Sequence, residues 1–369
     1  MKIEKLDIVR FAPRGNDSFI EAVTTKVNKY FEDNKISPYA NTGMWVKTAF
    51  MISLYIIPYL VMVTGLAAGN VWIYLGMWFL MGWGMVGIGT SVMHDANHGT
   101  YSASKKVNKF IGHILEVIGG FTATWKIQHN VLHHTYTNIA GLDEDIESIF
   151  LLRLSPNQPV RWFHKYQYLY AWFFYMNMTI YWMTVKDYLA AIRYGKHDLL
   201  KKEKLTLRQA ISRITIFKVI YYAYVMALPM FISGQPWYMI LVGFCVMHFT
   251  VGMVLSCVFQ PAHVMEDSAY LAPVVSNGTK RMEDTWAIHE LANTSNFAPN
   301  NHLLSWFIGG LNFQIEHHLF SDVCHVHFKK LAPIVKSVAL EYGIPYNSQP
   351  SFFGALWLHF KMLKKLGEV

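Results

Sequence analysis

The chain has 369 residues, of which 53% are hydrophobic and only 15% are charged. Soluble domains carry about 25% charged residues, so this composition excludes an ordinary soluble protein, and the chain lacks the polar, Gly-Pro or heptad patterns of disordered, collagen-like or coiled-coil proteins. Three cysteines, an odd number, do not make a disulfide scaffold and predict reduced thiols.

The net charge of +8 is the excess of 32 Lys and Arg residues over 24 Asp and Glu residues, and the basic residues are unevenly distributed. A basic balance often marks a nucleic-acid-binding protein. Here no Lys or Arg occurs between Lys47 and Lys105 or between Lys218 and Lys280, and these gaps are the most apolar parts of the chain. We therefore assign the positive charge to loops beside membrane segments and expect no nucleic-acid partner. The first residues lack the apolar core of a signal peptide, so none is expected.

Each of these two regions without Lys or Arg contains most or all of two apolar runs, which are separated by turn residues. They cover residues 50–68 and 71–93, and then residues 214–232 and 237–259. Each approaches the roughly 20 apolar residues that cross about 30 Å of hydrocarbon, so we predict four transmembrane helices in two hairpins. The alternative, four buried helices of a soluble core, is disfavoured because soluble helices seldom stay apolar on every face for so long.

Both hairpin turns lack Lys and Arg, whereas the rest of the chain holds all 32. The positive-inside rule then predicts that both termini and the long middle loop are cytoplasmic. The resulting division is a cytoplasmic N-terminal segment (1–44), a membrane domain (45–345) and an amphipathic cytoplasmic tail (346–369).

Four other stretches are less apolar. Residues 110–125 and 166–184 are interrupted by Gly, Asn or His, and we interpret them as helices in the headgroup zone, where aromatic side chains gather. Residues 331–341 and 352–366 have the pattern of amphipathic helices. The expected fold is therefore an all-α integral membrane protein, with interfacial helices and a cytoplasmic cap of helices.

The chain has seventeen histidines, and many of them cluster at the predicted cytoplasmic ends of the spans. Two pairs have a four-residue spacing that places both imidazoles on one helical face, and two other pairs are adjacent. One more histidine directly follows the fourth span. The clustered residues are His94, His98, His129, His133, His134, His263, His317 and His318.

This repetition predicts a multi-histidine metal centre. A lone histidine at a helix end is more often a hydrogen-bonded surface residue, but repeated spacings are hard to explain by packing. Eight imidazoles exceed the four ligands of a tetrahedral zinc site, so they imply two ions, and imidazole suits iron, copper, zinc or nickel. Asp95 and Glu316 lie inside the motifs and are expected to accept hydrogen bonds from ligand N–H groups, with ordinary interfacial charge as the alternative.

The segments 94–98, 129–134 and 314–318 resemble the His-x-x-x-His, His-x-x-x-His-His and Gln-x-x-His-His boxes of the integral-membrane fatty-acyl desaturases. The resemblance covers roughly residues 45–345. A Gln at the start of the third box is similar to the front-end subgroup, which inserts a double bond between an existing one and the carboxyl end. The resemblance implies a non-haem centre of two iron ions, O₂ as co-substrate, and His263 as an extra ligand. Gln314 stands where relatives outside the subgroup have a ligand, so its contact with metal is an open question.

The resemblance also implies partners. Many front-end relatives carry a fused haem domain with a His-Pro-Gly-Gly motif, which this sequence lacks. Electrons are therefore expected from a separate b-type cytochrome or ferredoxin with its reductase. The expected substrate is a long-chain fatty-acyl group carried on coenzyme A, on a carrier protein or in a lipid.

Two further histidines have open roles. His289 lies between His263 and the third box, where it would serve as a ninth ligand or as a hydrogen-bond donor to the centre. His248 lies mid-span, where an ionisable group is either functional or held in an interhelical hydrogen bond.

Other functions share some of these features. A hydroxylase or ketolase of the same histidine-box superfamily differs only in returning oxygen to the substrate carbon. A metal transporter would place polar ligands along a path at mid-membrane, where this sequence has only His248. A haem-binding electron carrier needs facing histidines inside the bundle, and motifs at helix ends fit this poorly.

Overall fold

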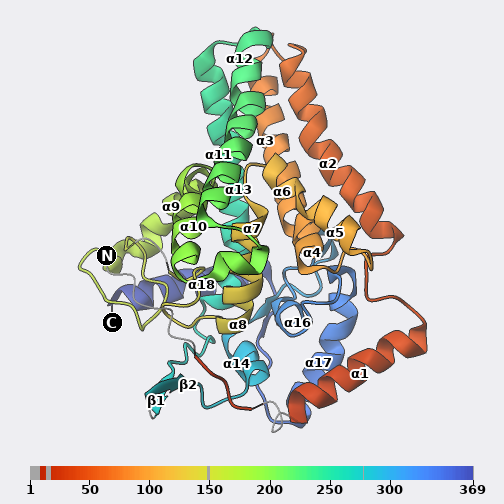
Figure 1. Cartoon of the computed structure of the whole chain (residues 1–369), viewed down its shortest axis with the longest axis vertical. Coiled ribbons are helices and arrows are strands. Elements are labelled where there is room, and N and C mark those ends of the chain that lie inside the picture. Colours follow the sequence, from red (N-terminus) through yellow and green to blue (C-terminus); the bar gives the residue numbers. More distant parts are fainter. Residues whose placement is uncertain (1–8, 14–17, 148–149, 277, 369) are drawn as a thin grey trace. The chain divides into compact units, whose positions relative to one another are not determined.

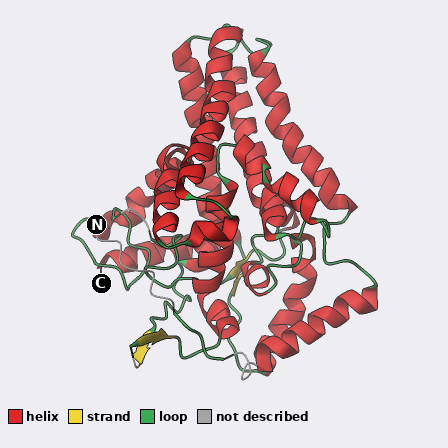
Figure 2. Cartoon of the chain, viewed as in Figure 1, coloured by secondary structure: helices red, strands yellow, loops and turns green. Residues whose placement is uncertain are grey.

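The computed structural model describes residues 9–13, 18–147, 150–276 and 278–368, so parts of the predicted N-terminal segment lie outside the described residues. The described chain is mostly helical, as Figure 2 shows, with short strands in two places. The prediction of an all-α fold is therefore confirmed apart from these strands, which the sequence pattern did not reveal. The chain divides into two compact units. We call residues 41–127 and 172–256 the span unit, and residues 1–40, 128–171 and 257–369 the box unit.

Four helices in the described part of the chain are long and apolar enough to cross a membrane, which confirms the predicted spans. Several of them continue through a π-helical turn, so one span contains more than one labelled helix. The four spans are Thr42–Val63 (α2), Val71–His98 (α3, Val71–Gly87, and α4, Met93–His98), Leu207–Ile232 (α11, Leu207–Tyr222, and α12, Leu228–Ile232) and Trp237–His263 (α13).

The helix bounds differ from the predicted ones because polar capping residues lie outside the apolar runs. α2 begins at Thr42 rather than at Phe50, since Asn41 accepts a hydrogen bond from the Met44 amide, and it ends at Val63 rather than at Ala68. The third span begins at Leu207 rather than at Ile214, and it is preceded by the capping residue Thr206. Hydropathy locates the centre of a span well, but the cap determines where the helix starts.

Glycines allow the helices of the span unit to pack closely. Helices α2 and α3 run side by side (Figure 1), and a Cβ atom at Gly84 would lie 2.5 Å from the backbone nitrogen of Tyr55. A Cβ atom at Gly82 would lie 3.0 Å from the carbonyl oxygen of Met247 in α13. Small residues favour such contacts in membranes, because close backbone packing replaces the missing hydrophobic driving force.

The two stretches predicted to lie in the headgroup zone are helical. Residues 110–125 fall in three short helices, α5 (Lys105–Gly112), α6 (Ile114–Val117) and α7 (Thr122–Lys126). Residues 166–184 lie mainly in α9 (Gln167–Tyr181), which continues through a π-helical turn into α10 (Asp187–Lys196). Their depth in a membrane stays a prediction.

The box unit combines short helices with two small sheets. Strands β1 (Val274–Ser276) and β2 (Thr279–Arg281) are antiparallel, and β3 (Asn296–Phe297) pairs in parallel with β4 (Ser348–Gln349). The stretches 331–341 and 352–366, which the sequence predicts as amphipathic helices, are helical and lie in α17 and α18. The helices of this unit are α1 (Ser18–Asn34), α8 (His134–Tyr136), α14 (Trp286–Asn293), α15 (His302–Phe307), α16 (Gln314–Leu319), α17 (Phe328–Glu341) and α18 (Phe352–Glu368).

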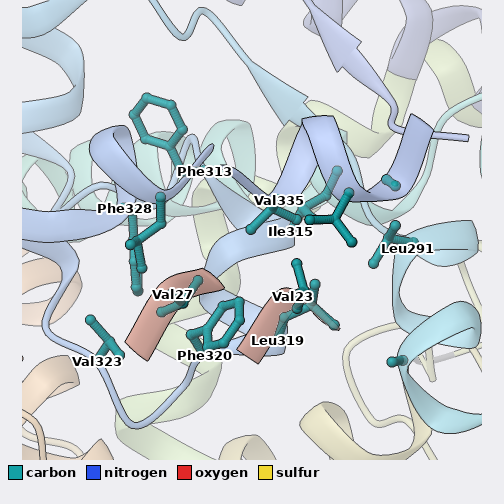
Figure 3. Close-up of a cluster of buried hydrophobic side chains, with 14 of the residues drawn as sticks. Val23, Val27, Leu291, Phe313, Ile315, Leu319, Phe320, Val323, Phe328 and Val335 are labelled. Carbon is teal, nitrogen blue, oxygen red and sulfur yellow. The ribbon is translucent and has the colours of Figure 1, made fainter. Parts of the chain in front are cut away.

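A hydrophobic core in the box unit supports the third histidine box. Figure 3 shows Val23 and Val27 of α1 beside Leu319 and Phe320, which end α16 and follow it. Leu331 of α17 belongs to the same cluster and is fully buried. The segment that carries the third box is therefore fixed by apolar packing on the side away from its polar residues.

We expect Leu331→Ala to destabilise the box unit by about 2–5 kcal/mol, because it leaves a cavity in this core. The matched control is Leu340→Ala on the same helix, where the side chain is 63% exposed. Thermal unfolding of the purified proteins in detergent, followed by circular dichroism, measures the difference. Equal transition midpoints for the two variants would contradict the assigned core.

Candidate metal centre

The second histidine box lies on a π-helical segment of the box unit. Residues Ile127–His133 form this segment, and α8 follows directly with His134. The rings of His129 and His133 stack with centroids 5.5 Å apart, and His134 packs edge-on against His129 at 4.7 Å. All three residues are buried. π-Helical turns are rare in proteins overall, but they occur often at functional sites. Here the turn carries His129 and His133, and the helix that continues from it begins with His134.

Two groups of three histidines form inside the box unit. In the first group, the ring centroids of His133, His263 and His318 lie 4.8 to 4.9 Å apart, and one candidate ligand atom from each lies within 4.8 Å of the others. In the second group, Nε2 of His134 lies 3.2 Å from Nε2 of His129 and 3.0 Å from Nε2 of His317. Six of the eight predicted histidines are therefore brought together.

The remaining two histidines lie in the span unit, on α4. The ring centroids of His94 and His98 are 4.7 Å apart, so the four-residue spacing places them on one face as expected. Trp125 of α7 turns its ring edge-on to both, with centroids at 5.6 and 5.9 Å. Asp95 follows directly, and its Oδ1 lies 3.8 Å from Nδ1 of His94.

Two buried carboxylates orient histidines of the box unit, and the sequence reasoning missed both. Nδ1 of His133 lies 3.1 and 3.2 Å from the two oxygens of Asp143, and Nδ1 of His318 lies 2.7 Å from Oε2 of Glu290. A signal existed for each of them. Asp143 lies in the acidic run that follows the second box, and Glu290 directly follows His289. A carboxylate on one ring nitrogen directs the other nitrogen toward a metal.

These contacts shift the pKa values of the groups involved. Burial lowers the pKa of His133, but the charges of Asp143 and Asp145 outweigh it and raise this pKa to about 9. Burial raises the pKa of Glu290 to about 8, against the opposing hydrogen bond from Thr137. Since a metal binds neutral imidazole, binding at His133 has to displace a proton.

Glu316, in the third box, forms a polar cluster with Asn296 and Tyr346. Its Oε2 accepts a hydrogen bond from Asn296 (2.8 Å), and its Oε1 accepts one from the hydroxyl of Tyr346 (2.8 Å). The side-chain oxygen of Asn296 also accepts a hydrogen bond from the main-chain amide of Ile315. Burial raises the pKa of Glu316 to about 7. This carboxylate therefore ties strand β3 and the loop before β4 to α16.

His289 and Gln314, whose roles the sequence left open, are both buried. Nε2 of His289 donates to the carbonyl oxygen of Thr137 (2.8 Å), and Nδ1 lies 3.3 Å from the side-chain amide of Asn293. Gln314 is 1% exposed, and its Nε2 has no hydrogen-bond partner among the described residues. His289 thus uses both ring nitrogens in contacts with the protein.

The box unit has the chemistry of a metal site. Nε2 of His263 is buried without a hydrogen-bond partner in the described part of the chain, which is costly unless something binds it. It lies among other imidazoles, whose neutral nitrogens suit first-row transition metals. The residues present therefore fit the predicted metal centre.

The family model and the similar proteins found by comparison are all described as desaturases. Residues 70–350 match the model of the family described as fatty acid desaturase. The chain is 35% identical over 350 residues to the sn-1 linoleoyl-lipid 6-desaturase of Arthrospira platensis, which covers 94% of this chain and 92% of that protein. It is 31% identical to the protein of the same name from Synechocystis sp., covering 95% and 96%. The acyl-lipid (8-3)-desaturase of Physcomitrium patens is 32% identical over 97% of this chain and 74% of its own length.

We expect Tyr346→Phe to destabilise the protein by about 1–3 kcal/mol, because it removes a donor from a buried carboxyl group. Tyr342→Phe is the matched control, since Tyr342 is 43% exposed and no hydrogen bond of its hydroxyl contributes to the cluster. Melting temperatures in detergent at one fixed pH measure both changes. A Tyr346→Phe protein as stable as the control would show that Glu316 does not need this donor.

Proposed function

The chain belongs to the fatty acid desaturase family, and on that basis we propose that it inserts a cis double bond into a long acyl chain of a membrane lipid, on the carboxyl side of an existing double bond. As a family member it is a membrane oxidoreductase that acts on fatty-acyl chains. Two similar proteins are named for acyl groups bound in lipid, which supports a lipid-bound substrate over a coenzyme A thioester. Gln314 at the start of the third box supports the front-end position of the new bond.

We assign the metal centre to two non-haem iron ions held by histidines. The observation that carries this assignment is the convergence of six imidazoles in the buried part of the box unit. The inclusion of the first box rests on its spacing and on the three-box pattern. The proposed ligands are His94, His98, His129, His133, His134, His263, His317 and His318.

Three neighbouring residues are given supporting roles. His289 acts through its hydrogen bond to the Thr137 carbonyl, and Glu316 through its hydrogen bonds with Asn296 and Tyr346. Asp95 acts as a carboxyl group next to His94, with its Oδ1 3.8 Å from Nδ1 of that histidine. Gln314 is a polar neighbour of His263, and its buried amide is placed close to the centre without being counted as a ligand.

The reaction needs a strong oxidant, because an unactivated methylene group has no acidic hydrogen. When bound, iron would activate O₂, the oxidant, which would be reduced to two waters by the two hydrogens of the acyl chain together with two electrons from a separate b-type cytochrome or ferredoxin and two protons. The side chains of this chain hold and orient the centre and exclude water from it, since the six histidines of the box unit are each at most 6% exposed. No side chain is required as a general base.

The orientation in the membrane is part of the proposal. Both hairpin turns lack Lys and Arg, whereas the segments beyond the opposite ends of the spans are rich in them, which supports cytoplasmic termini and a cytoplasmic centre. His248 gives no support to a transport path through the spans. Its Nε2 lies 2.7 Å from the Tyr221 hydroxyl and its Nδ1 lies 3.1 Å from the Thr179 hydroxyl, so it joins helices.

We expect a His→Ala change at any of the eight ligand positions to reduce the desaturated product to background, because each ligand is needed to hold the metal. The control is His113→Ala, whose exposed side chain pairs with Glu116 outside the motifs. Fatty-acid profiles of a desaturase-deficient host measure the product, and elemental analysis of purified protein measures iron. Near-normal product from any two of the eight variants, or negligible iron in the parent protein, would overturn the assignment.

We expect expression in a host fed linoleate to yield a product with one new double bond nearer the carboxyl end. Mass spectrometry of the lipids locates the bond and identifies the position on the glycerol. A hydroxylated or keto product would instead indicate the related oxygenating enzymes. A new bond on the methyl side of the existing one would contradict the front-end assignment.

A further inference from the structure

Helix α14 presents one polar face to the histidine groups of the box unit, although it contributes none of the eight proposed ligands. Trp286, His289, Glu290 and Asn293 have the spacing i, i+3, i+4 and i+7, which places them on one side of the helix. Ala287 and Leu291 belong instead to the buried apolar cluster of the same unit. The helix is thus fixed by packing on one side and is available for specific polar contacts on the other.

The first part of this face binds the segment of the second box. Nε1 of Trp286 donates to the carbonyl oxygen of His134 (2.9 Å), and Nε2 of His289 donates to the carbonyl oxygen of Thr137 (2.8 Å). Both acceptors are main-chain atoms at or just after the box. These bonds fix the backbone from which His133 and His134 project.

The second part of the face binds a ligand side chain directly. Oε2 of Glu290 lies 2.7 Å from Nδ1 of His318, and both side chains are 1% exposed. The hydroxyl of Thr137 lies 2.8 Å from the same oxygen and 2.7 Å from the carbonyl oxygen of His133, so its single proton serves one of the two. Glu290 therefore joins the third box to the segment after the second.

Asn293, the last residue of α14, contacts the end of α13 through its main-chain carbonyl oxygen rather than through its side chain. Nδ1 of His263 donates to the carbonyl oxygen of Asn293 (3.3 Å). The side-chain amide of Asn138 donates to the carbonyl oxygen of His263 (2.8 Å) and reaches that of Asn293 at 3.5 Å. One helix thus contacts all three segments that supply the box unit's histidines.

We propose that Glu290 is a positioning residue of the centre, and that α14 as a whole orders the histidines of the box unit. With Nδ1 of His318 held by Glu290, and Nδ1 of His263 held by Asn293, their Nε2 atoms are directed to the metal. His133 is held in the same way by Asp143. This inference rests on the proposed metal-binding function and extends it to residues outside the boxes.

The test compares iron binding by Glu290→Gln with that of the parent full-length chain. The substitution keeps the shape of the side chain but replaces one carboxyl oxygen with an amide group that can only donate, so the acceptor for Nδ1 of His318 is weakened or lost. Loss of such a partner weakens metal binding about 10- to 100-fold, so we expect iron to leave Glu290→Gln about 10- to 100-fold faster. Purified protein in detergent is loaded with ferrous iron, its iron content is measured, and release to a coloured chelator is timed.

The matched control is Glu283→Gln, an exposed glutamate of the same unit that should release iron at the parent's rate. Melting of the metal-free proteins separates a positioning role from a merely structural one, because a structural role lowers the midpoint and leaves iron release unchanged. Unchanged release from a folded Glu290→Gln protein overturns the inference but leaves the proposed function standing. A parent chain that binds no iron overturns the proposed function itself.

Two further variants keep the inference testable if Glu290→Gln does not fold. Thr137→Val removes the hydroxyl beside Oε2 of Glu290, and Trp286→Phe removes only the donor to the His134 carbonyl. Each is expected to speed iron release by a smaller factor than Glu290→Gln. Parent-like release from both would overturn the role of α14.

Discussion

The hydrogen bond that one ring nitrogen of a histidine donates to a buried carboxylate is the interaction on which the box unit depends. An imidazole has two nitrogens and free rotation about its side-chain bonds, so burial alone does not decide which nitrogen faces a metal. Asp143 decides it for His133, and Glu290 does so for His318. Each of these bonds links segments that are distant in sequence or separated by a loop, and so it orders the backbone together with the ring.

Such a polar interior requires support from apolar surroundings. In the box unit, the apolar cluster that includes Leu319, Phe320 and Leu331 packs against α16, and Leu291 of α14 belongs to the same cluster. This packing holds α14 and α16 in place, so their polar side chains, such as Glu290 and His318, can contact each other. In the span unit, the long helices satisfy their backbone groups internally, as a membrane requires, and glycines such as Gly84 allow close packing.

The sequence predicted most of the architecture, because the relevant signals are local. Long apolar runs identify membrane helices, and the four predicted spans overlap the four found among the described residues. Four-residue spacings placed His94 and His98 on one face without any tertiary information. Capping residues explain most of the boundary differences, since Asn41 and Thr206 are polar and lie outside the hydropathy signal.

The histidine boxes, and with them the family and its chemistry, could be read from the sequence, because ligand type and spacing are properties of the chain itself. The carboxylate partners could not be read, since nothing local links Glu290 to His318 or distinguishes Asp143 from the acidic residues beside it. The short parallel pairing of β3 with β4 was also invisible, because two residues per strand carry no periodicity. Only the folded chain decided which buried acid meets which imidazole, since that choice depends on distances between segments that the sequence leaves unspecified.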